Sequence, residues 1–144
     1  MENRTAELIE TLLPKDTNSY GNIFGGVIMS IMDKTAGVVC WRYARKRVVT
    51  ACAQRISFHT PINVGEVIYS RATIIYVGRS SMEVEVEVEA ENVIDGERRL
   101  AASGIFTMVA VDENWHPSPV PQWQPVTEAE LEKWRAVEKR RKTA

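Results

Sequence analysis

The chain has 144 residues, of which 44% are hydrophobic, 18 are basic and 19 are acidic, and its net charge is −1. Its length suits one domain with one core, and its apolar fraction excludes a disordered chain. The balanced charge excludes a general attraction to nucleic acid or to membrane surfaces. No apolar stretch approaches the ~20 residues of a bilayer span, and the first residues lack the pattern of a signal peptide. We therefore expect a cytoplasmic protein that neither inserts into a membrane nor binds nucleic acid.

The first half of the chain predicts one long helix after a short leading segment. Residues 4–13 fit either an edge strand or a short helix, and residues 14–22 are a run of turn formers. Residues 27–45 then read as one helix that is apolar on nearly every face through its first half. Such a helix is expected to be buried rather than to lie on a surface. Its basic end suits the C-terminus of a helix.

The second half of the chain is mostly strand. Four segments are rich in β-branched or alternating residues: 48–58, 67–77, 82–91 and 100–111. Within the third, Met82 and every second residue after it are apolar, whereas glutamates occupy the positions between them. This strict alternation predicts a strand with one buried face and one solvated glutamate face, paired at most with basic residues of a neighbouring strand. Asp95 and Gly96 then predict a tight hairpin turn.

After Asp112 the sequence becomes rich in proline and then charged. Residues 127–142 predict a short helix, with Thr127 as N-cap and Glu130 at the capping-box position. We expect one domain over residues 1–120, followed by a connector and helical tail over residues 121–144. A helix that is apolar all round needs a curved antiparallel sheet to wrap it, which predicts an α+β fold. Two such units would pair or cover each other, so we expect a homodimer at least.

Several stretches together resemble the acyl-CoA hydrolase family of hotdog-fold thioesterases. They are residues 16–26, the Met32-Asp33 pair, and residues 48–50, 58–65, 77–84 and 109–112, all in the family's order and spacing. The resemblance implies a hotdog fold and hydrolysis of acyl-CoA, with coenzyme A as part of the substrate and no separate cofactor. It also implies that Asp33 and Asn18 are catalytic and meet across a dimer interface. Three dimers often assemble into a trimer of dimers in this family, so the resemblance also implies a hexamer.

Asp33 and the residues before the helix are the candidate catalytic groups. Asp33 stands in an apolar stretch, so it is either a structural bridge or a base or nucleophile toward the thioester. Asn18 lies among turn formers, where an Asx turn is the plainest explanation, but the resemblance implies that it positions water or the carbonyl. Gly25 and Gly26 allow a tight turn, and their N–H groups at a helix N-terminus also suit an oxyanion.

A second group of residues suits the phosphates of coenzyme A. Arg79, Ser80 and Ser81 lie at a turn between two predicted strands, where such residues are usually just solvated. A guanidinium and two hydroxyls there also suit phosphate binding, assisted by Arg47 and its basic neighbours at the end of the long helix.

The sequence predicts no metal site. His59 and His116 are the only histidines, and neither they nor Cys40 and Cys52 have metal-ligand spacing. The same scarcity excludes a Ser-His-Asp mechanism. We expect both cysteines to be reduced thiols in the core, because nothing indicates an oxidising compartment. Three alternatives stay open: an acyl-CoA-binding regulator without hydrolysis, a hotdog dehydratase or hydratase that would need a histidine such as His59, and a purely structural subunit.

Overall fold

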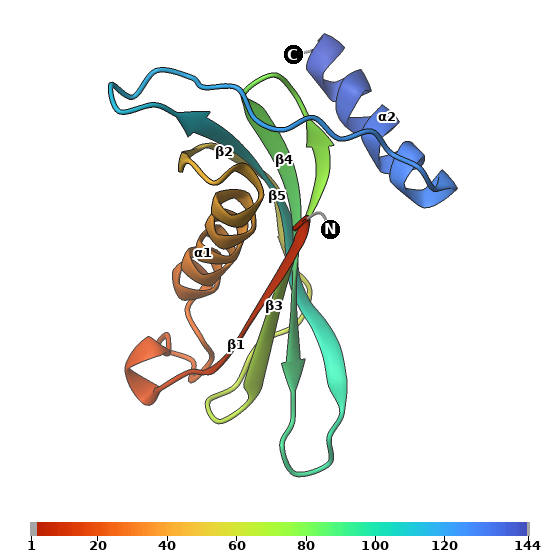
Figure 1. Ribbon diagram of the computed structural model, residues 1–144. Helices are drawn as coiled ribbons and strands as arrows, with labels where there is room; N and C mark the ends of the chain where they lie inside the picture. The colour runs from red at the N-terminus through yellow and green to blue at the C-terminus, as the bar shows by residue number, and fades with distance from the viewer. Residues whose placement is uncertain (1–2, 144) are drawn as a thin grey trace.

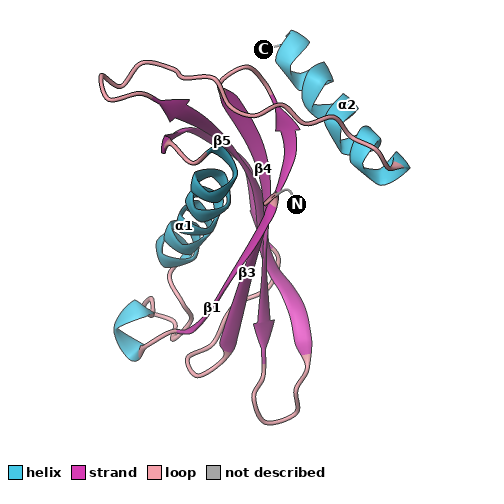
Figure 2. Ribbon diagram, in the orientation of Figure 1, coloured by secondary structure: helices cyan, strands magenta, loops and turns pink. Residues whose placement is uncertain are grey.

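The computed structural model describes residues 3–143. In chain order its elements are β1 (Thr5–Thr11), the 3-10 turn η1 (Pro14–Asp16), α1 (Gly25–Ala44), β2 (Arg47–Phe58), β3 (Val67–Val77), β4 (Ser81–Glu91), β5 (Arg98–Val111) and α2 (Glu128–Thr143). The five strands form one antiparallel sheet in the order β1-β3-β4-β5-β2. The sheet curves around α1, and α2 lies on the opposite face (Figures 1 and 2). The leading segment, which the sequence left open between helix and strand, is strand β1.

The core lies between α1 and the concave face of the sheet. The alternation in β4 places Met82, Val84, Val86, Val88 and Ala90 in this core, all fully buried. Burial of apolar area is the main favourable term in folding, so this row of side chains fixes which face of the sheet the helix covers. The long helix predicted over residues 27–45 is present as α1, which begins at Gly25 and ends at Ala44.

One side of α1 is not covered by any other part of residues 3–143. Thr35 and other residues toward the sheet are fully buried, whereas Met29 is 37% and Trp41 49% exposed. Nearby, Phe24 is 54% and Phe58 52% exposed. Within the described residues the sheet covers only one side of α1, which leaves the open side that we expected a second copy to cover. Four large apolar side chains are left for another surface to cover.

Strand β2 is an open, irregular edge of the sheet. It pairs with β5 alone, with register shifts between Thr50 and Cys52 and between Gln54 and Ser57. Arg55, in the second of these bulges, has a left-handed backbone with φ of 56°. Cys52 is exposed on this edge, so the prediction that it is a core thiol is wrong. Cys40 is buried as expected, and burial raises the pKa of its thiol to about 12.

The tail forms a helix that packs on the outer face of its own sheet. Trp134 of α2 lies against Tyr76 and Trp123, with ring centroids 4.4 Å and 5.7 Å apart. The predicted capping box is present, since Glu130 N–H donates to Thr127 Oγ1 at 3.1 Å and Thr127 N–H to Glu130 Oε1 at 3.0 Å. This packing and capping hold α2 against β3.

The glutamate row of β4 was predicted to be solvated, and this prediction is wrong at Glu83, near the start of the strand, because α2 covers that part of the outer face. Glu83 is only 4% exposed and accepts hydrogen bonds from Arg141 of α2 at 2.8 Å and from Thr107 at 2.9 Å. Farther along β4, Glu89 pairs with Arg98 of β5 at 2.6 Å, the kind of cross-strand pair that the alternation allowed.

Candidate active site

Asn18 lines a pocket of about 360 Å³ at the N-terminal end of α1, together with Gly25, Ile28, Phe58 and His59. Its Oδ1 accepts hydrogen bonds from the backbone N–H of Tyr20 at 2.9 Å and of Asn22 at 3.2 Å. The Asx turn expected from the sequence is therefore real, and it fixes the side chain. Within residues 3–143, the Nδ2 group donates to no protein acceptor. The Asx turn uses only the side-chain oxygen of Asn18, so the Nδ2 group is left as a hydrogen-bond donor in the pocket.

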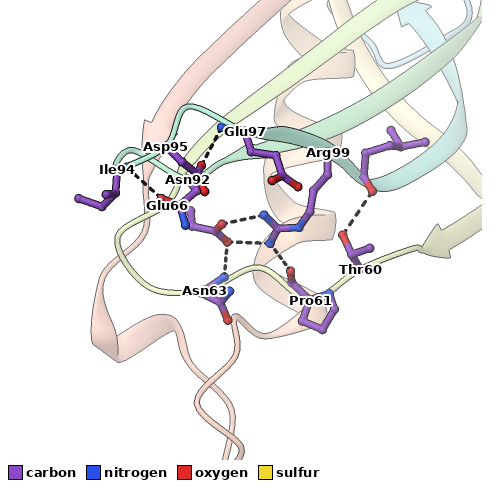
Figure 3. A network of polar contacts seen from close by, with 10 residues as sticks. Thr60, Pro61, Asn63, Glu66, Asn92, Ile94, Asp95, Glu97 and Arg99 are labelled. Carbon is purple, nitrogen blue, oxygen red and sulfur yellow. Dashed lines mark hydrogen bonds and ion pairs between the residues drawn. The ribbon is translucent and has the colours of Figure 1, made fainter.

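Residues 59–62 form a loop that lines the Asn18 pocket, and one arginine holds this loop in place. Arg99 donates from Nη1 to Glu66 Oε2 at 2.7 Å and from Nη2 to Glu66 Oε1 at 2.8 Å and to the Pro61 carbonyl at 2.6 Å (Figure 3). Asn63 N–H donates to the same carboxylate at 2.8 Å and bridges to Asn22 of the pocket. The hydrogen bonds from Arg99 hold the pKa of Glu66 below its usual value, against the opposing effect of burial. A charge-assisted network thus keeps this loop rigid.

The two glycines at the start of α1 face different spaces. Gly25 lines the Asn18 pocket, and a Cβ there would lie 3.3 Å from Cζ of Phe58. Gly26 instead lines a separate hollow between α1 and the end of β1. Neither glycine N–H donates to a protein acceptor within the described chain, and the N-cap, Phe24, provides no side-chain cap. Of the two, only Gly25 combines a free N–H at the positive end of the helix with a place beside Asn18.

Asp33 lies farther along α1, half-buried, and faces β2. Thr50 Oγ1 donates a hydrogen bond to Asp33 Oδ1 at 2.6 Å. Asp33 is not among the residues that line the Asn18 pocket. The structure of one chain therefore brings Asp33 together with Thr50 but not with Asn18.

The predicted phosphate-binding residues lie at the other end of the molecule. The turn with Arg79, Ser80 and Ser81 is at the top of Figure 1, far from η1 and the Asn18 loop. Arg47 is at the same end, with its guanidinium 4.5 Å from the ring of Trp115. The segment that follows β5 runs between them, since Val120 N–H donates to the Arg79 carbonyl at 2.9 Å. The four residues thus share one end of the sheet, but no hydrogen bond joins Arg47 to the turn within the described chain.

The described residues contain neither a group of histidine, cysteine, aspartate or glutamate side chains that could hold a metal ion nor a helix with the length and apolarity needed to cross a bilayer.

Comparison with known proteins identifies the family. The model of the thioesterase superfamily matches residues 20–96. The uncharacterized acyl-CoA thioester hydrolase YkhA of Bacillus subtilis is 40% identical over 120 residues, which are 83% of this chain and 70% of that protein. The chain belongs to the acyl-CoA hydrolase family of the thioesterase superfamily. The hotdog fold and the enzyme class implied by the resemblance, a thiolester hydrolase, are thereby confirmed.

Two solved hydrolases align over nearly the whole chain. A hexameric acyl-CoA thioesterase in its apo form has a TM-score of 0.90 and 36% identity, covering 96% of this chain and 89% of that one. The acyl-CoA hydrolase of Staphylococcus aureus, solved with butyryl coenzyme A and coenzyme A, has a TM-score of 0.85 and 30% identity, covering 96% of this chain and 85% of that one.

The Staphylococcus aureus enzyme has also been solved as alanine variants of an asparagine, an aspartate and a threonine. The asparagine and aspartate have the same separation in sequence as Asn18 and Asp33 of this hydrolase, and the aspartate and threonine the same separation as Asp33 and Thr50. Thr50 received no role from the sequence, because threonine is ordinary in a strand and only the fold brings it to Asp33.

His59 is a second residue of this hydrolase whose role could not be fixed from the sequence. It lines the Asn18 pocket, and its Nε2 lies 2.9 Å from Ser103 Oγ. The ring is thus paired with a hydroxyl and not with a carboxylate among the described residues. That pairing weakens the dehydratase alternative, which needs a histidine acting with a carboxylate.

Proposed function

We propose that the chain is a cytoplasmic acyl-CoA thioesterase that hydrolyses acyl-CoA to a free acid and coenzyme A in a site shared by two copies. One copy would contribute Asn18 and Gly25, and the other Asp33 with Thr50. The observation that carries the proposal is the hydrogen bond from Thr50 to Asp33, in a chain whose Asn, Asp and Thr have the spacing of the three residues replaced in the Staphylococcus aureus enzyme.

The separation of the two groups supports a shared site. Asn18 lines a pocket that Asp33 does not reach, while the side of α1 not covered by the sheet and the edge strand β2 are open. A second copy placed on this surface would cover Met29, Trp41 and Phe58 and bring its own Asp33 toward the pocket. We propose a homodimer as the minimum assembly and a trimer of dimers as the full one, in line with the hexameric relative.

In the proposed reaction, a water oxygen adds to the thioester carbonyl carbon, the C–S bond breaks, and the thiolate of coenzyme A takes up a proton. Asp33 would accept a proton from the water as general base, or attack the carbonyl itself to give an anhydride that water then opens. Thr50 engages only Oδ1. The Oδ2 atom accepts no hydrogen bond from the protein within residues 3–143, and this oxygen is the one left to face the reactants.

The negative charge that develops on the carbonyl oxygen needs donors in fixed positions. The Gly25 N–H, at the positive end of α1 and beside Asn18, is the backbone donor that we assign to it. The Asn18 Nδ2 group, held by the Asx turn, is the second donor or the group that positions water. We give Gly26 a smaller part than the sequence suggested, since it lines a different hollow.

The test is a thiol-release assay over a panel of acyl-CoA chain lengths, run with the wild type and with Asp33→Asn. The variant should keep its fold and lose nearly all turnover, because the amide can neither accept the proton nor act as nucleophile. An Asp33→Asn enzyme that stays active would refute the mechanism. Wild-type protein that binds acyl-CoA tightly without releasing thiol would instead support the regulator alternative.

A mixing experiment tests whether the site is shared. Asn18→Ala and Asp33→Ala chains, each inactive alone, should regain activity when they are unfolded together and refolded, because mixed dimers contain one intact site. Refolding each variant by itself is the control. If mixtures regain nothing while co-purification of differently tagged chains shows mixed oligomers, the site lies within one chain.

A further inference from the structure

The loop that carries Asn18 has little regular structure of its own. Residues 17–24 lie between η1 and α1 and contain only turns and isolated bridges. Within this loop Asn22 holds Asn18 twice, since its N–H donates to Asn18 Oδ1 at 3.2 Å and its carbonyl accepts from the Asn18 N–H at 2.6 Å. The position of the Asn18 amide therefore depends on what holds Asn22.

Asn22 is tied to the body of the protein through the segment that follows β2. It forms a bridge with Asn63, and the next residue, Ile23, donates its N–H to the Ile62 carbonyl at 2.9 Å. Ile23 and Ile62 are only 4% and 1% exposed, so both side chains lie in the core where the two segments meet. The position of residues 61–63 is thus passed on to Asn22.

Arg99 and Glu66 hold the backbone on both sides of Ile62. Arg99 Nη2 donates to the Pro61 carbonyl at 2.6 Å, and Glu66 Oε1 accepts from the Asn63 N–H at 2.8 Å (Figure 3). Two further hydrogen bonds, of 2.7 Å and 2.8 Å, join the guanidinium to the carboxylate. The Glu66 side chain is only 9% exposed, so the pair is shielded from water on that side. Such a bidentate, charge-assisted pair has a well-defined geometry and fixes both neighbouring peptide groups.

Arg99 is not among the residues that line the Asn18 pocket, so these contacts are its route to the reaction. We propose that Arg99, through Glu66 and the backbone of residues 61–63, is the positioning residue that holds Asn18 in its working orientation. The proposal rests on the proposed function for the role of Asn18. Catalytic groups have to be held within a fraction of an ångström, and a displacement of ~1 Å lowers a rate by about 100-fold.

The first test is the steady-state kinetics of Arg99→Gln, whose kcat should fall roughly 10- to 100-fold. Arg98→Gln is the matched control, because Arg98 is the preceding residue of β5 and its ion pair, with Glu89, is exposed. Glu66→Gln is a second variant that tolerates folding better, since the arginine left behind is partly exposed and keeps its bond to the Pro61 carbonyl. An unchanged kcat in folded Arg99→Gln, or an equal loss in Arg98→Gln, would overturn the proposal.

The mixing experiment gives a sharper readout, because the same replacement can be placed in either chain. In a dimer of an Asn18→Ala chain with an Asp33→Ala chain, the one intact site takes Asn18 from the Asp33→Ala chain. Arg99→Gln added to that chain should lower the regained activity roughly tenfold or more. Added to the Asn18→Ala chain instead, it should leave the regained activity unchanged, since that chain has no Asn18 to position. Equal losses from both placements would show that Arg99 only stabilises the protein.

Hydrogen exchange followed by mass spectrometry separates this inference from the proposed function, because it needs no turnover. In Arg99→Gln the amides of residues 17–24 should exchange faster than in the wild type, whereas those of β4 should keep their rates. Arg98→Gln should leave both segments as they are. If residues 17–24 exchange at the wild-type rate in Arg99→Gln, the link to Asn18 is refuted, whatever the kinetics show. If their exchange accelerates but no acyl-CoA is hydrolysed by the wild type, the link stands and the proposed function fails.

Discussion

Replacing Thr50 by valine tests how much the orientation of Asp33 contributes to catalysis. Valine has nearly the shape of threonine and suits a strand, so the pairing of Thr50 with Met108 of β5 should persist. What is lost is the 2.6 Å hydrogen bond to Asp33 Oδ1. Hydrogen bonds to charged groups contribute about 1.5–3 kcal/mol, and the exposure of Thr50 in the single chain argues for the lower end. A loss of ~1.5 kcal/mol in the transition state lowers kcat/KM roughly tenfold.

The assay is initial-rate thiol release with one good acyl-CoA substrate, alongside urea denaturation of each variant. Thr50→Ser keeps the hydroxyl donor and is the matched control, so its kcat/KM should stay close to that of the wild type. Thr50→Val with unchanged kcat/KM would show that Asp33 needs no such support. If Thr50→Ser loses as much activity as Thr50→Val, the methyl group rather than the hydrogen bond is responsible, and the reasoning fails.

Two further predictions concern the stability of the fold. A Cβ on Gly104 would lie 2.4 Å from Cδ1 of Ile56, so Gly104→Ala should lower the free energy of unfolding by about 1–3 kcal/mol in urea titrations. Adding Ile56→Val, which removes Cδ1, should recover part of this loss. No recovery would mean that the other close contact, with Met32 Cε at 3.2 Å, causes the loss. Because hydrogen bonds from Arg99 hold the pKa of Glu66 below 4.5, their stabilisation is complete above that pH and is lost as the pH falls through the lower folded value. The stability gap between wild type and Glu66→Gln, measured by urea unfolding from pH 6 to pH 3, should therefore shrink on acidification, and a constant gap would contradict this origin.

Local patterns were enough to predict most elements of the fold. The alternation that starts at Met82 marked the central strand and its buried face, and the Thr127–Glu130 capping box marked the start of the last helix. Both signals depend on residues a few positions apart, where periodicity and capping act directly. Asn18 and Asp33 were found differently, from a resemblance carried by several separate stretches.

Features that depend on distant contacts could not be predicted. Glu83 lies between two apolar residues in sequence, as Glu85 and Glu87 do, yet it is buried because α2 lies over it. Cys52 has an apolar environment in sequence but lies on an edge that no further strand of the described residues covers. Thr50 gains its importance only from the side chain of Asp33 across the fold. In each case the deciding partner comes from another element, which a local pattern does not contain.

The strand order also has a consequence for how the chain can fold. Neighbours β3, β4 and β5 follow one another in sequence and can form as a meander, whereas β1 pairs with β3 and β2 pairs with β5. Both outer strands therefore precede their partners by long stretches of chain, and such non-local pairings form slowly. During synthesis from the N-terminus, α1 and β2 emerge well before Val111 completes β5. Until then the apolar face of the helix has no sheet to cover it, and this interval is when the nascent chain is most exposed to aggregation or to capture by chaperones.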